Sequence, residues 1–374
     1  MNKQLSVYLD LLRFFAAVIV FVSHLSGFMG GLLWQLSGIG HEAVVFFFVL
    51  SGFVIAYVVY EKQETATSYT VNRLSRIYSV ALPAIILTVI LYYLGSAIDP
   101  TNEFKILEER LLNPVWTVIA ASTFINQSWI ATPLFSNLPY WSLGYEVLYY
   151  IFFGILVYVA GVKKYLLLAA ICLVMGPSVM LYLPVWLMGV LCFKTVGRVS
   201  LSLLAASLLY AISVIGIIVV ALDVNEHAIN QYAMHVIGVE FYQILLEPAE
   251  HFISDYILGI FVTLHIFASY HLGKYLAVFG KRSEAIIRNI SSHTFSIYLY
   301  HMPLLYFAFA VFPPASHQIE NTIACCLVVP VCIYLLSCYT ENKKWAYKNF
   351  FKTYLIRKEA KTNDEASTLA RRKA

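Results

Sequence analysis

Charged side chains are scarce in this sequence. Asp, Glu, Lys and Arg make up 12% of the 374 residues, and hydrophobic residues make up 60%. Soluble domains carry about 25% charged residues, and a soluble fold could not keep this many apolar helices buried. The apolar runs are close to the length that spans a bilayer, and they are continuous rather than alternating, which excludes a transmembrane β-barrel. The composition therefore predicts an all-α, polytopic membrane protein.

Disulfide patterns and paired metal ligands are also lacking. All six cysteines fall inside apolar runs, no C-x-x-C pattern recurs, and we interpret these residues as small buried hydrophobes. The segment 223–251 is rich in Asp, Glu and His, so a metal site is one interpretation of it, and a solvated acidic loop is the favoured one. We expect no metal and no nucleic-acid partner.

A cleavable signal peptide and an internal repeat are likewise missing. Asp10 and Arg13 interrupt the first apolar run, and no A-x-A cleavage pattern follows it, so we expect this helix to be retained. The lack of a repeat weighs against an inverted-repeat transporter.

The apolar runs predict ten spans, with approximate bounds 8–28, 43–60, 78–97, 142–160, 164–181, 183–197, 201–222, 252–272, 292–312 and 320–340. The stretch 113–126 is short, so we predict a re-entrant or interfacial segment there. With an inner N-terminus, the outer loops hold only Lys105 and Arg110 of the 25 Lys and Arg residues. We therefore predict N-in and C-in termini, a membrane domain over 1–340, and a basic cytoplasmic tail over 341–374 that is amphipathic and then disordered.

Three arginines lie toward the inner ends of the predicted spans. Arg13 is one to two turns from the inner surface, and Arg73 and Arg76 lie one turn apart at the inner mouth of the third span. Ionisable groups inside a bilayer are costly and are functional candidates by default, and arginine binds phosphate bidentately. The alternatives are that Arg13 snorkels or pairs with Asp10, and that Arg73 and Arg76 are positive-inside anchors.

A histidine and a carboxylate are predicted at comparable depth near the outer side. His24 is near the outer end of the first span, Glu146 is near the outer end of the fourth, and His301 is close to mid-membrane. A glutamate that orients a histidine ring and stabilises its imidazolium suits general-base chemistry on a hydroxyl. His301 is also compatible with a packed core histidine. His41 and Glu42 are compatible with a simple helix cap.

Five motifs in order make this pattern specific. They are RFFAAVIVFVSH from Arg13 to His24, FFVLSGF at 47–53, RLSRIY at 73–78, LPYWSLGYEVLYY at 138–150 and FSIYLYHMPLL at 295–305. Together they resemble the acyltransferase-3 family of bacterial integral-membrane O-acyltransferases, from residue 13 to about residue 305. One departure is Ala43-Val44-Val45, where the family often has Gly-Val-Asp.

The resemblance implies an enzyme of the bacterial inner (cytoplasmic) membrane. Such an enzyme moves an acyl group, usually acetyl from cytoplasmic acetyl-CoA, to a hydroxyl of a cell-surface or lipid-linked glycan. The predicted partners are therefore acyl-CoA, a glycan acceptor and membrane lipids. By this likeness we predict catalytic His24 and Glu146, acyl-CoA-binding Arg13, Arg73 and Arg76, and substrate-binding Trp141, Ser142 and His301.

Several alternatives stay open at this stage. A covalent acyl-His24 intermediate is one variant of the mechanism. Ser51 is interpreted as a site of close helix contact rather than a nucleophile, and Ser142 as a helix cap or a substrate contact. A transporter or flippase of a lipid-linked sugar or small solute would share the polar column, but it would not need phosphate-binding arginines.

Overall fold

The computed structural model describes residues 3–99, 107, 113–222, 232, 234–239, 242, 249–273, 275 and 278–354. Within these ranges the chain is helical and contains no β-strand beyond one isolated bridge between Leu134 and Asn137. Nine of the helices in these ranges are long and apolar enough to cross a membrane. The predicted all-α, polytopic fold is confirmed.

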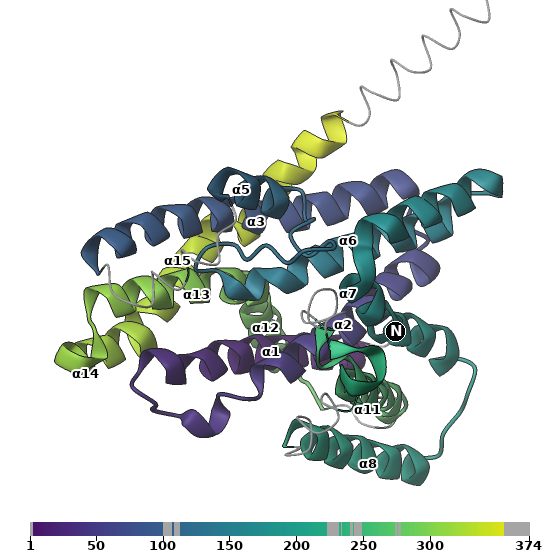
Figure 1. The fold of residues 1–374 in the computed structure, drawn as a ribbon. Helices are drawn as coiled ribbons and strands as arrows, with labels where there is room; N and C mark the ends of the chain where they lie inside the picture. The colour runs from purple at the N-terminus through teal and green to yellow at the C-terminus, as the bar shows by residue number, and fades with distance from the viewer. Residues whose placement is uncertain are drawn as a thin grey trace, which may run out of the picture.

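The helices coincide with the predicted spans, although α3 begins twelve residues before the predicted third span, and α1 contacts α2, α12 and α13 in the bundle (Figure 1). Their bounds are α1 Lys3–Phe28, α2 Gly40–Ala56, α3 Ala66–Ile98, α5 Pro114–Ser122, α6 Trp141–Tyr158, α7 Gly161–Val196, α8 Leu203–Ala221, α11 Phe252–Leu272, α12 Lys281–Ser291, α13 Thr294–Val311, α14 Pro314–Ile323 and α15 Val329–Tyr339. A π-helical turn, Tyr57–Glu61, extends α2.

The long helix α7 folds back on itself. Just before it begins, the Tyr158 hydroxyl donates to the Glu64 carbonyl oxygen at 2.6 Å. Near its end, the Lys194 ammonium lies 4.8 Å from the centre of the Tyr60 ring. A straight helix of 36 residues would separate these ends by about 54 Å. Both ends of α7 therefore lie on one side of the protein, beside the segment that follows α2.

The reversal in α7 takes place at Gly176. This residue has φ 71° and ψ 177°, a conformation that favours glycine, and a Cβ there would lie 2.7 Å from the Trp129 nitrogen. The two arms correspond to the predicted spans 164–181 and 183–197, but the break lies earlier than predicted. This is why ten predicted spans become nine continuous helices in the described residues.

Two glycines bring α2 and α7 into backbone contact. A Cβ on Gly52 would lie 2.0 Å from the Trp186 carbonyl oxygen, and one on Gly189 would lie 1.9 Å from the Val49 carbonyl oxygen. No side chain fits at either position. The close contact predicted for the FFVLSGF motif is made by Gly52, and Ser51 is left to make polar contacts.

The stretch directly before α6, residues 134–140, is largely buried, and most of the chain between α5 and α6 is not helical. The short helix α5 is nine residues long, and the Asn113 side chain caps it by accepting from the nitrogens of Val115 and Trp116. Further along, Asn137 is fully buried and donates to the Leu299 carbonyl oxygen at 2.9 Å. Tyr140, directly before α6, is also fully buried. The helix α6 therefore begins inside the protein.

The division into a membrane domain over 1–340 and a tail over 341–374 stays a prediction, as do the N-in and C-in termini. The chain remains helical up to Tyr354 after a short 3₁₀ turn, Glu341–Lys343. The predicted disordered end of the tail, and most of the acidic segment 223–251, lie outside the described residues.

Candidate functional site

A cavity of about 70 Å³ with apolar walls and a group of polar side chains lies where α1, α2, α3, α6 and α13 meet. Its walls are partly apolar, with Phe47 and Phe48 among them. Its polar lining is contributed by Arg13, Ser51, Arg76, Ser142, Glu146, Tyr150, Thr294 and Tyr298. Four of the eight predicted site residues, Arg13, Arg76, Ser142 and Glu146, therefore share one cavity, which we call the inner cavity.

Arg76 faces the inner cavity without an ion-pair partner. Its side chain makes no hydrogen bond or ion pair with any residue that the structure describes. A partly buried guanidinium presents five donors, and the Glu146 carboxylate lines the same cavity. The phosphate-binding role of Arg76 stays a prediction.

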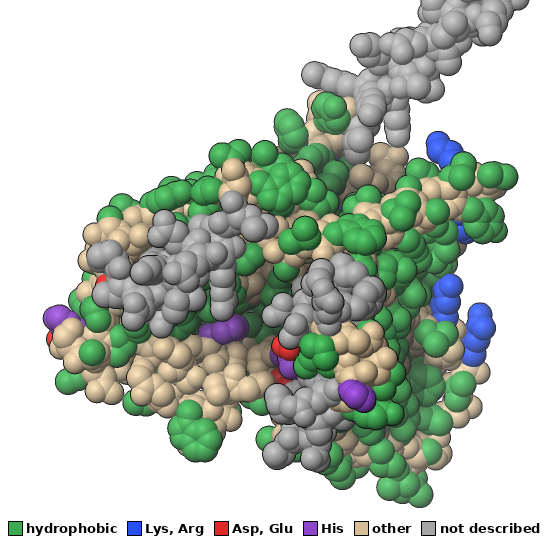
Figure 2. Space-filling model, viewed as in Figure 1, with side chains coloured by type: hydrophobic (Ala, Val, Ile, Leu, Met, Phe, Trp, Pro, Cys, Tyr) green, Lys and Arg blue, Asp and Glu red, His purple; other side chains and the backbone are tan. Residues whose placement is uncertain are grey.

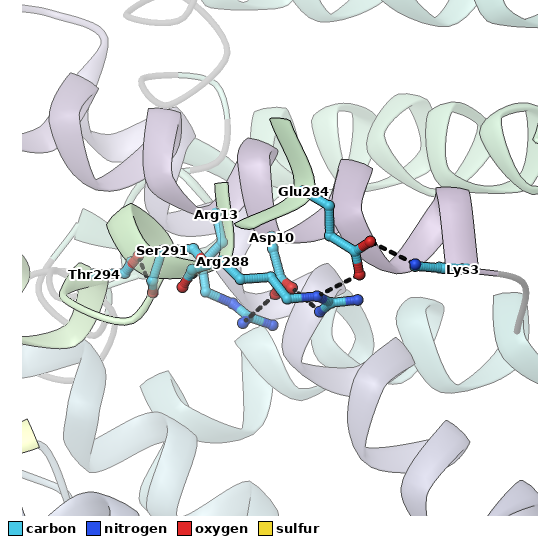
Figure 3. Close-up of polar contacts among 7 residues, drawn as sticks. All are labelled: Lys3, Asp10, Arg13, Glu284, Arg288, Ser291 and Thr294. Carbon is cyan, nitrogen blue, oxygen red and sulfur yellow. Dashed lines mark hydrogen bonds and ion pairs between the residues drawn. The ribbon is translucent and has the colours of Figure 1, made fainter. Parts of the chain in front are cut away.

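Arg13 is held at the end of a chain of ion pairs that joins α12 to α1 (Figure 3). Lys3 and Arg288 pair with Glu284 at 2.6 and 3.1 Å, Arg288 pairs with Asp10 at 2.9 Å, and Asp10 pairs with Arg13 at 3.2 Å. The hydrogen bonds from Lys3 and Arg288 lower the pKa of Glu284 below its ordinary value. Arg13 therefore pairs with Asp10, as one of the alternatives from the sequence predicted. It also lines the inner cavity.

Arg73 does not line the inner cavity. It lies 3.6 Å from the Glu64 carboxylate, and its guanidinium lies 5.7 and 5.9 Å from the ring centres of Tyr69 and Tyr150. Positions three apart on a helix are offset by about 60°, which is enough to turn Arg76 into the cavity and Arg73 toward Glu64. The three predicted phosphate-binding arginines are therefore not equivalent.

Glu146 lies in the inner cavity and is held by hydroxyl groups. Ser51 Oγ donates to its Oε1 at 2.9 Å, and the Tyr150 hydroxyl donates to the same oxygen. Ser51 in turn accepts from Trp186 Nε1 at 3.2 Å. Sequence reasoning assigned Ser51 only to close packing and missed these polar contacts.

His24 is paired with His301, in a separate hollow near the other end of α1. Each ring has its Nδ1 next to a backbone carbonyl oxygen, His24 at 2.7 Å from Val20 and His301 at 3.0 Å from Ile297. His301 Nε2 lies 3.3 Å from His24 Nδ1. Because a carbonyl oxygen only accepts, each Nδ1 carries a proton in a neutral ring, and His24 Nε2 keeps its lone pair.

The hollow beside His24 has a volume of about 320 Å³. We call it the outer hollow. It is lined by Ser23, His24, Ser26, Gly27, Phe28, Met302, Tyr306 and Phe309, and so by α1 and α13 alone. A lone pair on His24 beside an open hollow is placed for proton abstraction from a bound hydroxyl.

The predicted contact between His24 and Glu146 is wrong. The hydrogen bonds of Glu146 in the described chain go to Ser51 and Tyr150, and those of His24 go to Val20 and His301. The prediction counted the depth of Glu146 from a membrane surface. Since α6 begins inside the protein, Glu146 lies level with the arginines instead.

Tyr298 lines the inner cavity and contacts His301, the partner of His24. Its hydroxyl lies 2.6 Å from Ser142 Oγ and donates to the Pro139 carbonyl oxygen at 3.0 Å. Its ring centre lies 6.3 Å from that of His301. Ser142, in the inner cavity, therefore contacts a tyrosine that also contacts the histidine pair.

Trp141 belongs to a different cluster, which sequence reasoning did not find. The ring lies against Tyr145 at 5.1 Å and parallel to His41 at 6.2 Å. His41 pairs with Asp255 of α11 at 2.9 Å. One signal in the sequence could have indicated this pair, because Asp255 is a carboxylate inside the predicted span 252–272. His41, in contrast, was interpreted as a helix cap.

The described residues contain no group of three His, Cys, Asp or Glu side chains placed to hold a metal ion.

These observations define a class of protein, a polytopic helical membrane protein with a polar cavity and a buried histidine pair. The particular family follows from comparison. The family model described as an acyltransferase domain, acyltransferase-3, matches residues 6–337. The chain therefore belongs to this family, and the predicted family and enzyme class, a membrane acyltransferase, are confirmed.

One relative shares part of the chain. A protein named acyltransferase MdmB, from Streptomyces mycarofaciens, is 29% identical over 153 residues, which are 38% of this chain and 36% of that protein. The match thus spans little more than a third of the relative's length. No solved structure matches the chain.

Proposed function

We propose that this acyltransferase takes an acyl group, most simply acetyl, from cytoplasmic acyl-CoA and moves it to a hydroxyl of a cell-surface or lipid-linked glycan. Its place would be the bacterial inner (cytoplasmic) membrane. The observation that carries the proposal is Arg76, a guanidinium that faces the inner cavity with no ion pair to any described residue.

The donor would bind from the side of the inner cavity. CoA carries its negative charge on phosphates, and Arg76 offers a fork of donors that matches a phosphate. Arg13 would join it by exchanging Asp10 for the ligand.

The acyl group would then reach His24 along α1. Arg13 and His24 lie about three turns apart, a rise of roughly 16 Å, which is of the order of an extended pantetheine arm. Tyr298, which lines the inner cavity, and His301, which contacts His24, are the side chains of α13 beside this proposed path.

His24 Nε2 would act as the general base. It accepts the proton of the acceptor hydroxyl while that oxygen attacks the thioester carbonyl carbon. The new C–O ester bond forms, the C–S bond breaks, and the CoA thiolate takes the proton from the imidazolium. The Val20 carbonyl oxygen and His301 orient the ring, a task that the sequence assigned to Glu146.

Acyl transfer by purified protein tests the proposal. Free-thiol release from acetyl-CoA is measured with glycan acceptors that mild alkali has stripped of ester groups, for wild type and His24→Ala. His317→Ala, which removes an exposed histidine of α14, is the matched control. We expect acceptor-dependent release in wild type and the control, and none in His24→Ala. A wild-type protein that does not bind acetyl-CoA would contradict the proposal.

A further inference from the structure

Asp255 is a buried carboxylate that the proposed mechanism does not use. It lies in the first turn of α11 and is only 2% exposed. His41 Nε2 lies 3.1 and 2.9 Å from its two oxygens, and the Tyr182 hydroxyl donates to Oδ2. A carboxylate buried at this depth is costly unless it is well paired, so the three side chains form one fixed unit from α2, α7 and α11.

His41 is the member of this unit that reaches the surface. Its side chain is 27% exposed, against 3% for Asp255. Its ring is parallel to Trp141, with an angle of 13° between the planes, and the His251 ring lies 4.8 Å away. The unit therefore presents a polar edge beside the flat face of a half-buried tryptophan.

The unit lies next to the outer hollow. Gly40, the neighbour of His41, packs so closely on α1 that a Cβ there would lie 2.3 Å from Ser23 Oγ. Ser23 lines the outer hollow, and His24 is the next residue. The contact between Gly40 and Ser23 therefore forms a seam that leads from His41 to His24. In the space-filling view, histidine and acidic side chains lie recessed on the same face (Figure 2).

We propose that the acceptor saccharide binds along this seam, with its reacting hydroxyl in the outer hollow and a neighbouring sugar ring at His41 and Trp141. Sugars present closely spaced hydroxyls that pair with histidine and carboxylate groups, and their C–H faces pack on aromatic rings. Asp255 is a positioning residue that acts through His41. This inference rests on the proposed function for the nature of the substrate.

A purely structural role is the competing explanation, because the His41–Asp255 pair also joins α2 to α11. The two roles differ in which ligand binds more weakly when the His41–Asp255 pair is broken. A structural pair would affect donor and acceptor alike when it is broken, whereas an acceptor site affects the saccharide alone.

The test is a binding measurement on the full-length protein in detergent. The probes are fluorescently labelled, alkali-deacylated saccharides prepared from lipopolysaccharide, capsule and peptidoglycan of the cells that carry the gene, and acetyl-CoA is titrated separately. The variants are His41→Gln and Tyr182→Phe, with His317→Gln as the control. We expect His41→Gln to weaken binding of one saccharide at least tenfold and to leave acetyl-CoA binding unchanged. Tyr182→Phe should weaken it less.

Each outcome decides the matter. Equal saccharide binding by wild type and His41→Gln overturns the acceptor site, as does a wild type that binds none of the saccharides. Saccharide binding that depends on His41, in a wild type that does not transfer acetyl, keeps the site and refutes the proposed function. If His41→Gln does not fold, Trp141→Phe replaces it, and unchanged saccharide binding there likewise overturns the inference.

Discussion

The inner cavity and the outer hollow share α1, yet they are built from opposite kinds of chemistry. The inner cavity holds two guanidinium groups and a carboxylate, and Arg76 faces it without an ion pair in the described chain. The outer hollow holds neutral side chains, and backbone carbonyl oxygens fix His24, which lines it, and His301, which contacts His24. In the proposed mechanism, the guanidinium groups of the inner cavity would bind the phosphates of the donor. The lone pair of His24 Nε2, at the outer hollow, would accept the proton of the acceptor hydroxyl.

This contrast predicts that substitutions in the inner cavity and in the outer hollow affect different steps of the reaction. Damage to the outer hollow should stop the reaction and leave donor binding intact, whereas damage to the inner cavity should weaken donor binding first. Tyr298 lines the inner cavity and contacts His301, so it connects the inner cavity to the histidine pair.

The largest effect is expected for His24→Ala. Loss of a general base costs about 10²- to 10⁴-fold in rate, and Glu146 cannot replace the ring because it lies in the inner cavity. Steady-state acetyl transfer checks the prediction, with His317→Ala as the control. Activity within a few-fold of wild type would show that His24 is not the base.

Arg76→Gln should act on the donor. A hydrogen bond to a charged group contributes about 1.5–3 kcal/mol, so we expect acetyl-CoA to bind about 10- to 100-fold more weakly. Calorimetric titration measures it. Arg73→Gln is the matched control, since Glu64 already engages that arginine. Equal losses in both variants would contradict the separation of Arg76 from Arg73.

Gly189→Ala should damage both spaces at once. The added Cβ meets the Val49 carbonyl oxygen, so α2 must move away from α7, at a cost of about 1–3 kcal/mol. Because α2 carries Ser51 and Gly40, we expect a lower melting temperature together with weaker donor binding and slower transfer. A melting temperature equal to that of wild type would contradict the rigid α2–α7 contact.

The smallest effect is expected at the ion pairs that join α12 to α1. Because the folded protein lowers the pKa of Glu284, its ion pairs stabilise the fold above the ordinary glutamate pKa and lose this effect as pH falls through the lowered value. We expect Glu284→Gln to melt slightly below wild type at neutral pH and together with it under acid conditions. A difference that grows as pH falls would refute this assignment.

Much of the fold was predictable because hydropathy dictates it. Long apolar runs fix where helices cross, and the α7 break differs only because Gly176 supplies the left-handed turn that the sequence pattern placed several residues later. The arginine cavity was predictable for the same reason, since Arg13 and Arg76 lie at known distances from the ends of their helices.

The remaining features depend on long-range packing that one sequence does not encode locally. Glu146 was assigned to His24 because its depth was counted along the chain, although a buried segment sets the start of α6. Asp255 was missed because its partners, His41 and Tyr182, come from helices far apart in sequence. Which polar side chains pair across a helical bundle depends on how the helices pack. The sequence indicates only that each buried polar group needs a partner.

Acetyl-CoA binding and acetyl transfer, measured side by side in His24→Ala and Arg76→Gln, test the central claim most directly. The division of labour predicts that His24→Ala binds acetyl-CoA with wild-type affinity and transfers nothing, while Arg76→Gln binds it weakly and recovers part of its transfer rate at high donor concentration. The reverse pattern, with binding lost in His24→Ala and kept in Arg76→Gln, would contradict it.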